Sequence, residues 1–301
     1  MSEKLTSHTI GLIGGDKRIS ILASIMKNNG CKVKVFGLVD EEDFDACEVC
    51  SSSQEIYKAC DVIVLPVPVS RDKITLFAEK QGVDIKLADM LGDMSNFGSK
   101  FVLGGIIPKD FCSLLKVYGH TAVDIFENKE LIQKNAIATA EGALMIAMEK
   151  MDSTVVSSNF GILGFGRIAS HLAKIVSSLG GNVTVFARRD EVIAEASALG
   201  YKTFRLSEDY DENYVSKMAE MLDSFSVIFN TIPSVVIDSK IISKMCCRPI
   251  YIELASYPYG INTKDAREQN FNTVYAPSLP GRYSPCSAAQ YLFEAINYYL
   301  T

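Results

Sequence analysis

Short apolar runs alternate along this chain with longer stretches in which apolar residues recur at three- and four-residue spacing. An apolar run of four to six residues that ends in glycine, proline or a polar residue is typical of a buried strand. The longer stretches have the period of a helix that packs one face on a core. This alternation predicts an α/β fold, with parallel sheets that are covered by helices on both faces.

The first half of the chain repeats this pattern from the N-terminus. A helix is expected at 18–28, after the first apolar run, and Gly30 closes it. The strands that we expect in this half are 9–13, 32–36, 61–65, 101–104 and 122–126.

The second half begins with a strong helical pattern at 140–152, which we interpret as a helix that connects two domains. The strands that we expect after it are 160–163, 183–186, 202–204, 226–230, 250–254 and 272–275. A last helix at 287–300 is expected to return and pack on the first domain. We therefore predict two doubly wound, Rossmann-like domains with an interdomain cleft, formed by 1–139 plus 282–301 and by 140–281.

The most informative stretch is the glycine turn after the strand at 160–163, where Gly164-Phe-Gly-Arg-Ile-Ala169 leads into a helical pattern. Gly164 permits a tight turn, Gly166 lets the backbone approach a pyrophosphate, and Ala169 lets helix and strand pack closely. The N–H groups at the start of the helix then face the phosphates. The dinucleotide-binding residues expected here are Gly164, Phe165, Gly166, Arg167 and Ile168. The alternative is a plain tight turn between strand and helix.

The end of the next strand indicates which dinucleotide is bound. It reads Ala187-Arg188-Arg189, and an acidic residue, Asp190, comes only afterwards. A carboxylate at this place binds the ribose 2′-hydroxyl of NAD, whereas arginine accommodates the 2′-phosphate of NADP. The sequence therefore favours NADP, with NAD as the alternative, unless both arginines are merely solvated loop residues.

Two further segments follow strands in the same half. Ligands of parallel sheets bind outside the carboxyl ends of the strands, so both segments are expected at the cofactor. The segment 230–234 ends in a stiff proline and is expected beside a ribose or the nicotinamide, although it could also be a strand that proline simply stops. The residues assigned to the cofactor from these segments are Thr231, Ile232, Pro233, Leu254, Ala255 and Ser256.

Composition narrows the class of protein. The chain is 48% hydrophobic and 22% charged, as in ordinary globular proteins. A net charge of −6 and a pI near 5.3 argue against a nucleic-acid partner. We find no signal peptide or apolar stretch of membrane-spanning length, and expect a cytoplasmic protein. Of eight cysteines only Cys47 and Cys50 have motif-like spacing, without a second pair for zinc, so no metal is expected.

Taken together, these segments resemble the A subunits of bacterial dipicolinate synthases over nearly the whole chain. The second domain is more distantly similar to the D-2-hydroxyacid dehydrogenases. That broader family has a catalytic histidine shortly before its last helix, where this chain has Cys286. The segments that carry the resemblance are 13–16, 62–66, 135–142, 163–167, 187–188, 230–234, 254–256 and 277–281.

The resemblance implies a reaction and partners. It implies oxidation of the dihydrodipicolinate derived from 4-hydroxy-tetrahydrodipicolinate to dipicolinate, with reduction of NADP. It also implies a B subunit, a homo-oligomer and a role in the mother cell during sporulation. Ordinary hydroxyacid oxidation needs a base on the hydroxyl group, but here aromatisation of the ring favours loss of the hydride. The alternatives are another hydroxyacid dehydrogenase, or a nucleotide-binding subunit without catalysis.

The substrate is a dianion, so its site should offer positive charge or free N–H groups. Either Glu141 or Asp16 is expected to accept the proton. Thr139 and Glu141 have a second interpretation, as the cap and first turn of the connecting helix. The residues expected at the substrate are Gly14, Gly15, Pro66, Ser70, Arg71, Asn135, Thr139 and Arg282.

Overall fold

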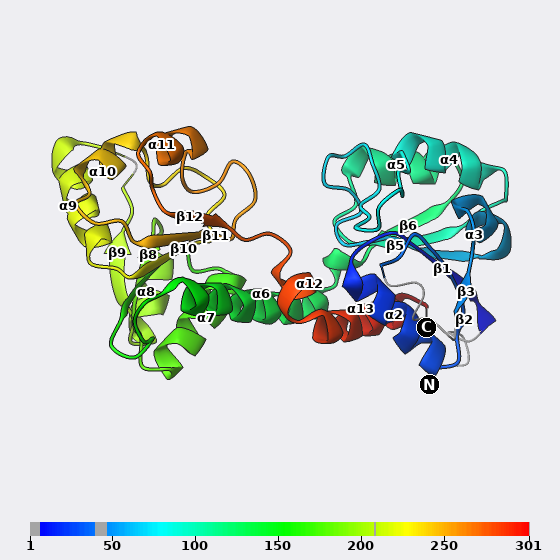
Figure 1. Cartoon of the computed structure of the whole chain (residues 1–301), viewed down its shortest axis with the longest axis horizontal. Helices are drawn as coiled ribbons and strands as arrows, with labels where there is room; N and C mark the ends of the chain where they lie inside the picture. The colour runs from blue at the N-terminus through cyan, green and yellow to red at the C-terminus, as the bar shows by residue number, and fades with distance from the viewer. Residues whose placement is uncertain (1–6, 40–46, 208, 301) are drawn as a thin grey trace. The chain divides into compact units, whose positions relative to one another are not determined.

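The structure of the protein is a computed structural model that describes residues 7–39, 47–207 and 209–300. The chain divides into two compact units. The first comprises the described residues up to Asn135 together with those from Pro280 onward, and the second runs from Ala136 to Leu279. Figure 1 shows each unit as a sheet with helices on both faces.

The described residues of the first unit form a six-stranded sheet in which each pair of neighbours is parallel. The strand order is β3-β2-β1-β4-β5-β6, so the order reverses between β1 and β4, where ligands bind in sheets of this kind. The strands are β1 (Thr9–Ile13), β2 (Lys32–Phe36), β3 (Glu48–Val49), β4 (Val62–Val64), β5 (Phe101–Gly104) and β6 (Thr121–Asp124).

Helices cover both faces of this sheet. On one face, Leu22 and Leu292 come from two different helices and pack in one apolar cluster with the strands. On the opposite face, Met90 and Leu115 belong to a second cluster. The helices of the first face are α2 (Lys17–Asn28) and α13 (Pro285–Leu300), and those of the second are α3 (Ser53–Ala59), α4 (Leu87–Ser95) and α5 (Lys109–Val117). The remaining helices are η2 (Ile125–Glu127) and α12 (Leu279–Tyr283).

The second unit repeats this topology. In its described part, six parallel strands are ordered β12-β11-β10-β7-β8-β9, with the reversal between β7 and β10. The prediction of two doubly wound parallel sheets is therefore confirmed. The strands are β7 (Asn159–Leu163), β8 (Asn182–Ala187), β9 (Lys202–Arg205), β10 (Val227–Asn230), β11 (Ile250–Glu253) and β12 (Thr273–Tyr275).

The helices of the second unit also lie on both faces. Residues such as Met218 and Ile241 pack in one apolar cluster with β8, β10 and β11. The helices on that face are α9 (Glu212–Asp223), α10 (Ser239–Lys244) and α11 (Thr263–Glu268). The other face carries α6 (Lys129–Lys150), α7 (Arg167–Ser178) and α8 (Asp190–Ala198). No helix in the described part of the chain is both long and apolar enough to cross a membrane.

The connecting helix is longer than the sequence pattern predicted. It begins at Lys129 rather than near 140, because the Asn128 side chain accepts hydrogen bonds from the N–H groups of Glu130 and Leu131, both 3.0 Å long. Thr139 therefore lies inside α6, and its interpretation as a helix cap is wrong.

Candidate functional site

The glycine turn of the second unit has the backbone that its sequence predicted. Gly164 adopts φ +94°, a conformation that favours glycine, and its N–H donates to Phe186 O at 2.8 Å. A Cβ at this position would lie 2.5 Å from Thr231 Oγ1. Only glycine allows the segment after β10 to pack directly on the turn.

The helix that follows the turn is open at its N-terminus. Gly166 occupies the cap position of α7 and has no side chain that could accept a hydrogen bond from the first turn. A Cβ on Gly166 would meet no atom within 4 Å, so the packing of the protein itself does not require glycine there. Ala169, one turn further on, is fully buried. An uncapped helix start with free space above it fits a pyrophosphate group.

Two hollows flank the turn and bring most of the predicted cofactor residues together. One has a volume of about 290 Å³, the other about 530 Å³. The smaller is lined by Gly164, Phe165, Gly166, Ala187, Arg188, Arg189, Val192 and Ile232, and the larger by Gly164, Gly166, Arg167, Ile168, Thr231, Ile232 and Pro233. The strand-end segments at 164–168, 187–189 and 231–233 thus form one continuous surface around the turn.

The two arginines border the smaller hollow. Arg188 extends toward the segment after β10, and its NH2 group donates to Ser234 Oγ at 3.4 Å. Asp190, the acidic residue that follows the arginines, forms an ion pair with Arg205 on β9. The guanidinium groups, rather than this carboxylate, therefore border the hollow in which a ribose would lie.

A buried polar cluster lies next to the residues of the larger hollow; the sequence predicted the segment 230–234 at the cofactor but named neither Asn230 nor Glu253 as a site residue. Asn230 and Glu253 end neighbouring strands, are 0% and 2% exposed, and are joined by a hydrogen bond of 2.7 Å. Burial raises the pKa of Glu253 above its usual range, and hydrogen bonds from Gly260, Asn230 and Ala255 oppose that shift. The sequence feature that could have revealed this cluster is Glu253, an acidic residue at the end of an otherwise apolar strand.

In the first unit, the turn after β1 differs from the turn in the second. The N–H groups of Gly14 and Gly15 donate to Phe36 O at 3.0 Å and Phe77 O at 2.8 Å. A Cβ on Gly14 would lie 2.9 Å from Phe77 O, because the chain near Ala78 pairs with the turn. The expectation that these two glycines offer free N–H groups to a substrate carboxylate is wrong.

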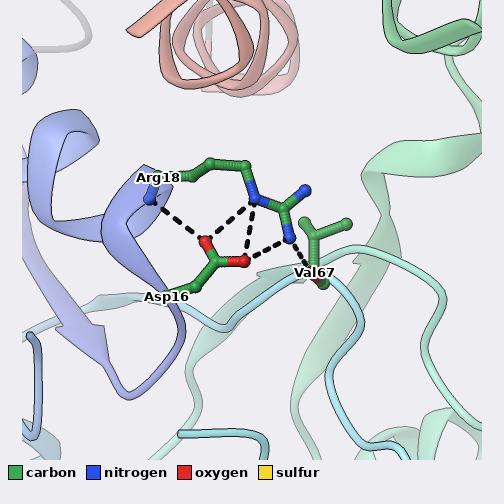
Figure 2. Close-up of polar contacts among 3 residues, drawn as sticks. All are labelled: Asp16, Arg18 and Val67. Atoms are coloured by element: carbon green, nitrogen blue, oxygen red, sulfur yellow. Dashed lines mark hydrogen bonds and ion pairs between the residues drawn. The ribbon is translucent and has the colours of Figure 1, made fainter. Parts of the chain in front are cut away.

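Asp16 caps α2 and forms an ion pair with Arg18 that is almost fully buried (Figure 2). Arg18 Nε lies 2.9 and 3.1 Å from the two carboxylate oxygens, and NH2 lies 2.7 Å from Oδ2. The same NH2 group also donates to Val67 O, next to the cis peptide bond between Val67 and Pro68. A Cβ on Gly281 in α12 would lie 2.7 Å from Asp16 Oδ2. The pair therefore joins the start of α2 to two other segments.

The other predicted substrate residues of this unit follow β4 or lie in α12. Pro66 and Ser70 are buried, and Ser70 Oγ donates to Asp72 at 2.9 Å. The guanidinium group of Arg71 lies over the Phe77 ring, 3.8 Å from its centre. Arg282 lies beside its neighbour Tyr283, with a distance of 5.2 Å from its guanidinium carbon to the ring centre. Arg71 thus remains at the strand-end edge, held by an aromatic contact.

The predicted residues of α6 lie on different parts of that helix. Asn135 belongs to the first unit and Thr139, which is buried, to the second. Glu141 is exposed and lines an apolar hollow of about 530 Å³ with Met145 and Ile175. Ile175 lies about two turns along α7 from the glycine turn. Glu141 is therefore on the flank of the second unit, and the structure does not bring it to the glycine turn.

Comparison with known proteins shows which proteins share this arrangement. Residues 9–126 match the family model for the N-terminal domain of the dipicolinate synthase A subunit. The A subunit of the Bacillus subtilis dipicolinate synthase is 26% identical over 295 residues, which cover 97% of this chain and 96% of the relative. The chain is similar to the dipicolinate synthase A subunits over nearly its whole length.

Solved structures agree with this relationship. The crystal structure of the dipicolinate synthase A subunit from Bacillus halodurans superposes with a TM-score of 0.84 at 25% identity, over 99% of both chains. The corresponding crystal structure from Bacillus subtilis gives 0.80 at 25% identity, over 98% of this chain and 96% of that one. A D-lactate dehydrogenase from Treponema pallidum, at 13% identity and a TM-score of 0.59, shares the fold over 96% of this chain and 95% of that one. The predicted resemblance to the dipicolinate synthase A subunits is thus confirmed.

Cysteine or metal chemistry is a separate question for the described residues. Cys286, at the position expected for the histidine of the hydroxyacid dehydrogenases, is an exposed residue near the start of α13. Among residues 7–39, 47–207 and 209–300, no group of three or more His, Cys, Asp or Glu side chains is placed to hold a metal ion. The geometry of the described chain therefore centres on the two strand-end surfaces.

Proposed function

We propose that this protein oxidises dihydrodipicolinate to dipicolinate and transfers the hydride to NADP. The observation that carries the dinucleotide assignment is the glycine turn, with its uncapped helix and the open space above Gly166. The similarity to dipicolinate synthase A subunits along nearly the whole chain supports the choice of substrate. By the same similarity we propose that its partner is a B subunit and that this chain self-associates.

The second unit provides the cofactor site in this proposal. Residues 164–168 bind the pyrophosphate, and Arg188 with Arg189 binds the 2′-phosphate through charge-assisted hydrogen bonds. Residues 231–233 and 254–256 lie beside the nicotinamide half. When bound, the dinucleotide supplies the hydride acceptor. The chain itself orients the ring and excludes water from the face where the hydride leaves.

The first unit provides the substrate site. Arg71 and Arg282 are the cations that we propose for the two carboxylates, with Pro66, Ser70, Asn135 and Thr139 as further contacts. Dehydration of 4-hydroxy-tetrahydrodipicolinate gives the dihydro compound, and loss of one hydride and one proton from it gives the aromatic ring. Because aromatisation favours both losses, a weak proton acceptor is sufficient.

Of the two carboxylates that we expect as proton acceptor, we propose Glu141, which lies on the flank of the second unit and therefore acts through water rather than by direct contact. Both oxygens of Asp16 already accept hydrogen bonds from Arg18, and that carboxylate is 3% exposed. Asp16 could accept a proton only after giving up its ion pair. Glu141 is exposed, and we propose that it passes the proton to solvent. Glu141→Gln should then lower kcat while leaving the affinity for NADP unchanged.

The decisive experiment supplies 4-hydroxy-tetrahydrodipicolinate to the purified protein, alone and with its B subunit, and follows NADP reduction and dipicolinate formation. We expect both products in equal amounts, and no NADP reduction when the substrate is left out. Absence of turnover at every ratio of the two subunits would refute the enzymatic proposal. Binding of NADP without turnover would favour a nucleotide-binding subunit, and turnover of simple hydroxyacids would favour a D-2-hydroxyacid dehydrogenase.

A further inference from the structure

The carboxylate of Glu253 accepts four hydrogen bonds. Oε1 accepts from Asn230 Nδ2 at 2.7 Å and from Ala255 N at 2.9 Å. Oε2 accepts from Gly260 N at 2.8 Å and from the Tyr251 hydroxyl at 3.3 Å. A carboxylate has about four acceptor positions, so these donors fill it. In the described part of the chain no lysine or arginine forms an ion pair with it, so the four neutral donors compensate its charge.

Tyr251 lies within β11 itself, and the other three donors lie at the end of β10 or in the loop after β11. Asn230 also donates to Ile232 O at 2.9 Å and accepts from Ile232 N at 3.0 Å, which fixes the segment after β10. Ala255 and Gly260 begin and end the loop after β11. One carboxylate therefore closes the 255–260 loop at both ends and joins it to Asn230. The residues that follow Asn230, 231–233, line the larger hollow beside the glycine turn.

The small size of Gly260 is part of the same arrangement. A Cβ at this position would lie 2.3 Å from Asn230 Nδ2 and 2.5 Å from the Tyr251 hydroxyl. The N–H of Gly260 can approach the carboxylate only because no side chain is in the way. Its carbonyl also accepts from Val236 N at 2.8 Å, which ties the loop to the segment beyond β10.

We infer that Glu253, together with Asn230, is the positioning residue for the nicotinamide half of the dinucleotide site. The inference rests on the proposed function, in which residues 254–256 lie beside the nicotinamide. An amide of the same shape cannot replace Glu253, because its nitrogen cannot accept the backbone N–H that the carboxylate oxygen accepts at that place. One loop end must then detach, which misplaces residues 254–256 while the glycine turn and the arginines keep their positions.

The test compares Glu253→Gln with the wild type in two binding assays. NADPH contacts the whole dinucleotide site, whereas 2′-phosphoadenosine 5′-diphosphate contacts only the adenosine half of it. We expect the Kd for NADPH to rise about tenfold or more, because a buried donor is left unsatisfied. The Kd for the fragment should change by less than about twofold. Equal Kd values for NADPH in variant and wild type would overturn the inference.

Three further variants separate positioning from general damage. Asn230→Asp combined with Glu253→Gln restores a hydrogen bond between the pair, but the amide nitrogen that donates it leaves Ala255 N without its acceptor. The double variant should therefore not rescue NADPH binding, and rescue would overturn the inference. Gly260→Ala should reproduce the effect with all polar groups present. Leu222→Ala removes apolar packing in the same unit and should lower the melting temperature. It should reduce the affinity for both ligands equally, or for neither.

The unliganded wild-type protein provides a test that depends on neither turnover nor folding of a variant. Amide hydrogen exchange at Ala255 and Gly260 should be much slower than at Ser256 and Tyr257 within the same loop. Uniform exchange across the loop would overturn the role of the carboxylate. If the wild type bound no NADPH while this protection was present, the proposed function would be refuted. The conclusion that Glu253 holds both ends of the 255–260 loop would still hold.

Discussion

Asp16 and Arg18 form a buried ion pair across the first turn of α2, with Arg18 Nε and NH2 both donating to the carboxylate (Figure 2). Asp16 Oδ1 at the same time accepts from Arg18 N at 3.1 Å and so caps the helix. Because Arg18 also donates to Val67 O, the pair fixes the segment after β4, where Ser70 and Arg71 follow. The first unit thus holds its strand-end edge together with a buried ion pair, whereas the second uses the hydrogen bond between Asn230 and Glu253.

Removing one partner of this pair should destabilise the first unit strongly. Arg18→Met leaves the Asp16 carboxylate buried without a cation, and breaking such a pair costs about 3–5 kcal/mol. The free energy of unfolding in urea measures the loss.

The matched control for this prediction removes both charges. Asp16→Ser combined with Arg18→Met keeps a side chain that caps α2, and it should recover most of the lost stability. If the double variant were as unstable as Arg18→Met alone, the packing around the guanidinium group, rather than its charge, would explain the loss.

Gly166 should be needed for the dinucleotide and not for folding. A Cβ there meets no protein atom within 4 Å, so Gly166→Val should change the melting temperature little while it blocks the approach of a pyrophosphate. We expect the Kd for NADP to rise about a hundredfold, measured by calorimetry. Gly164→Ala is the contrast, because its Cβ would collide with Thr231 and should lower stability as well.

The sequence predicted the strands and the glycine turn well because their signals are local. The run before Gly164 and the spacing to Ala169 are visible within a few residues, and the structure has the strand and helix there. The predicted start of α6 lies too far toward the C-terminus because Thr139 looked like a helix cap, whereas Asn128 provides the cap. Local pattern cannot choose between two competing caps when the sequence between them is itself compatible with a helix.

The features that the sequence did not predict depend on contacts between distant segments. Gly14 and Gly15 look like an anion-binding turn, but their N–H groups are occupied by Phe36 and Phe77, and the second of these follows more than sixty residues later. The partners of Glu253 likewise come from three segments. Period and spacing describe neighbours along one element, so contacts of this kind become visible only in the folded chain.

Arg188 and Arg189 should determine the preference for NADP. Replacing both with alanine removes charge-assisted hydrogen bonds to the 2′-phosphate, each of which contributes about 1–3 kcal/mol. The Kd for NADP should therefore rise far more than the Kd for NAD, which lacks that phosphate. Both values can be measured by titration of the two oxidised dinucleotides. Equal losses for NADP and NAD would refute the assignment of the arginines to the 2′-phosphate.

His120 should make the stability of the first unit depend on pH. Its side chain is buried, its Nδ1 accepts from Lys100 N at 3.1 Å, and its Nε2 has no hydrogen-bond partner among the described residues. Burial, together with the charge of Lys100, lowers the pKa of His120 below its usual value. Above the usual histidine pKa, both the folded and the unfolded chain carry neutral His120, and pH has no effect through this group.

Below the usual histidine pKa the unfolded chain takes up a proton that the folded chain resists, so stability falls as the pH falls toward the lowered pKa. One proton contributes up to about 1.4 kcal/mol per pH unit. His120→Asn keeps an acceptor for Lys100 N but cannot be charged. The difference in free energy of unfolding between this variant and the wild type, followed in urea from about pH 8 to about pH 5, should therefore grow as the pH falls. Parallel curves over that range would show that folding does not shift the pKa of His120.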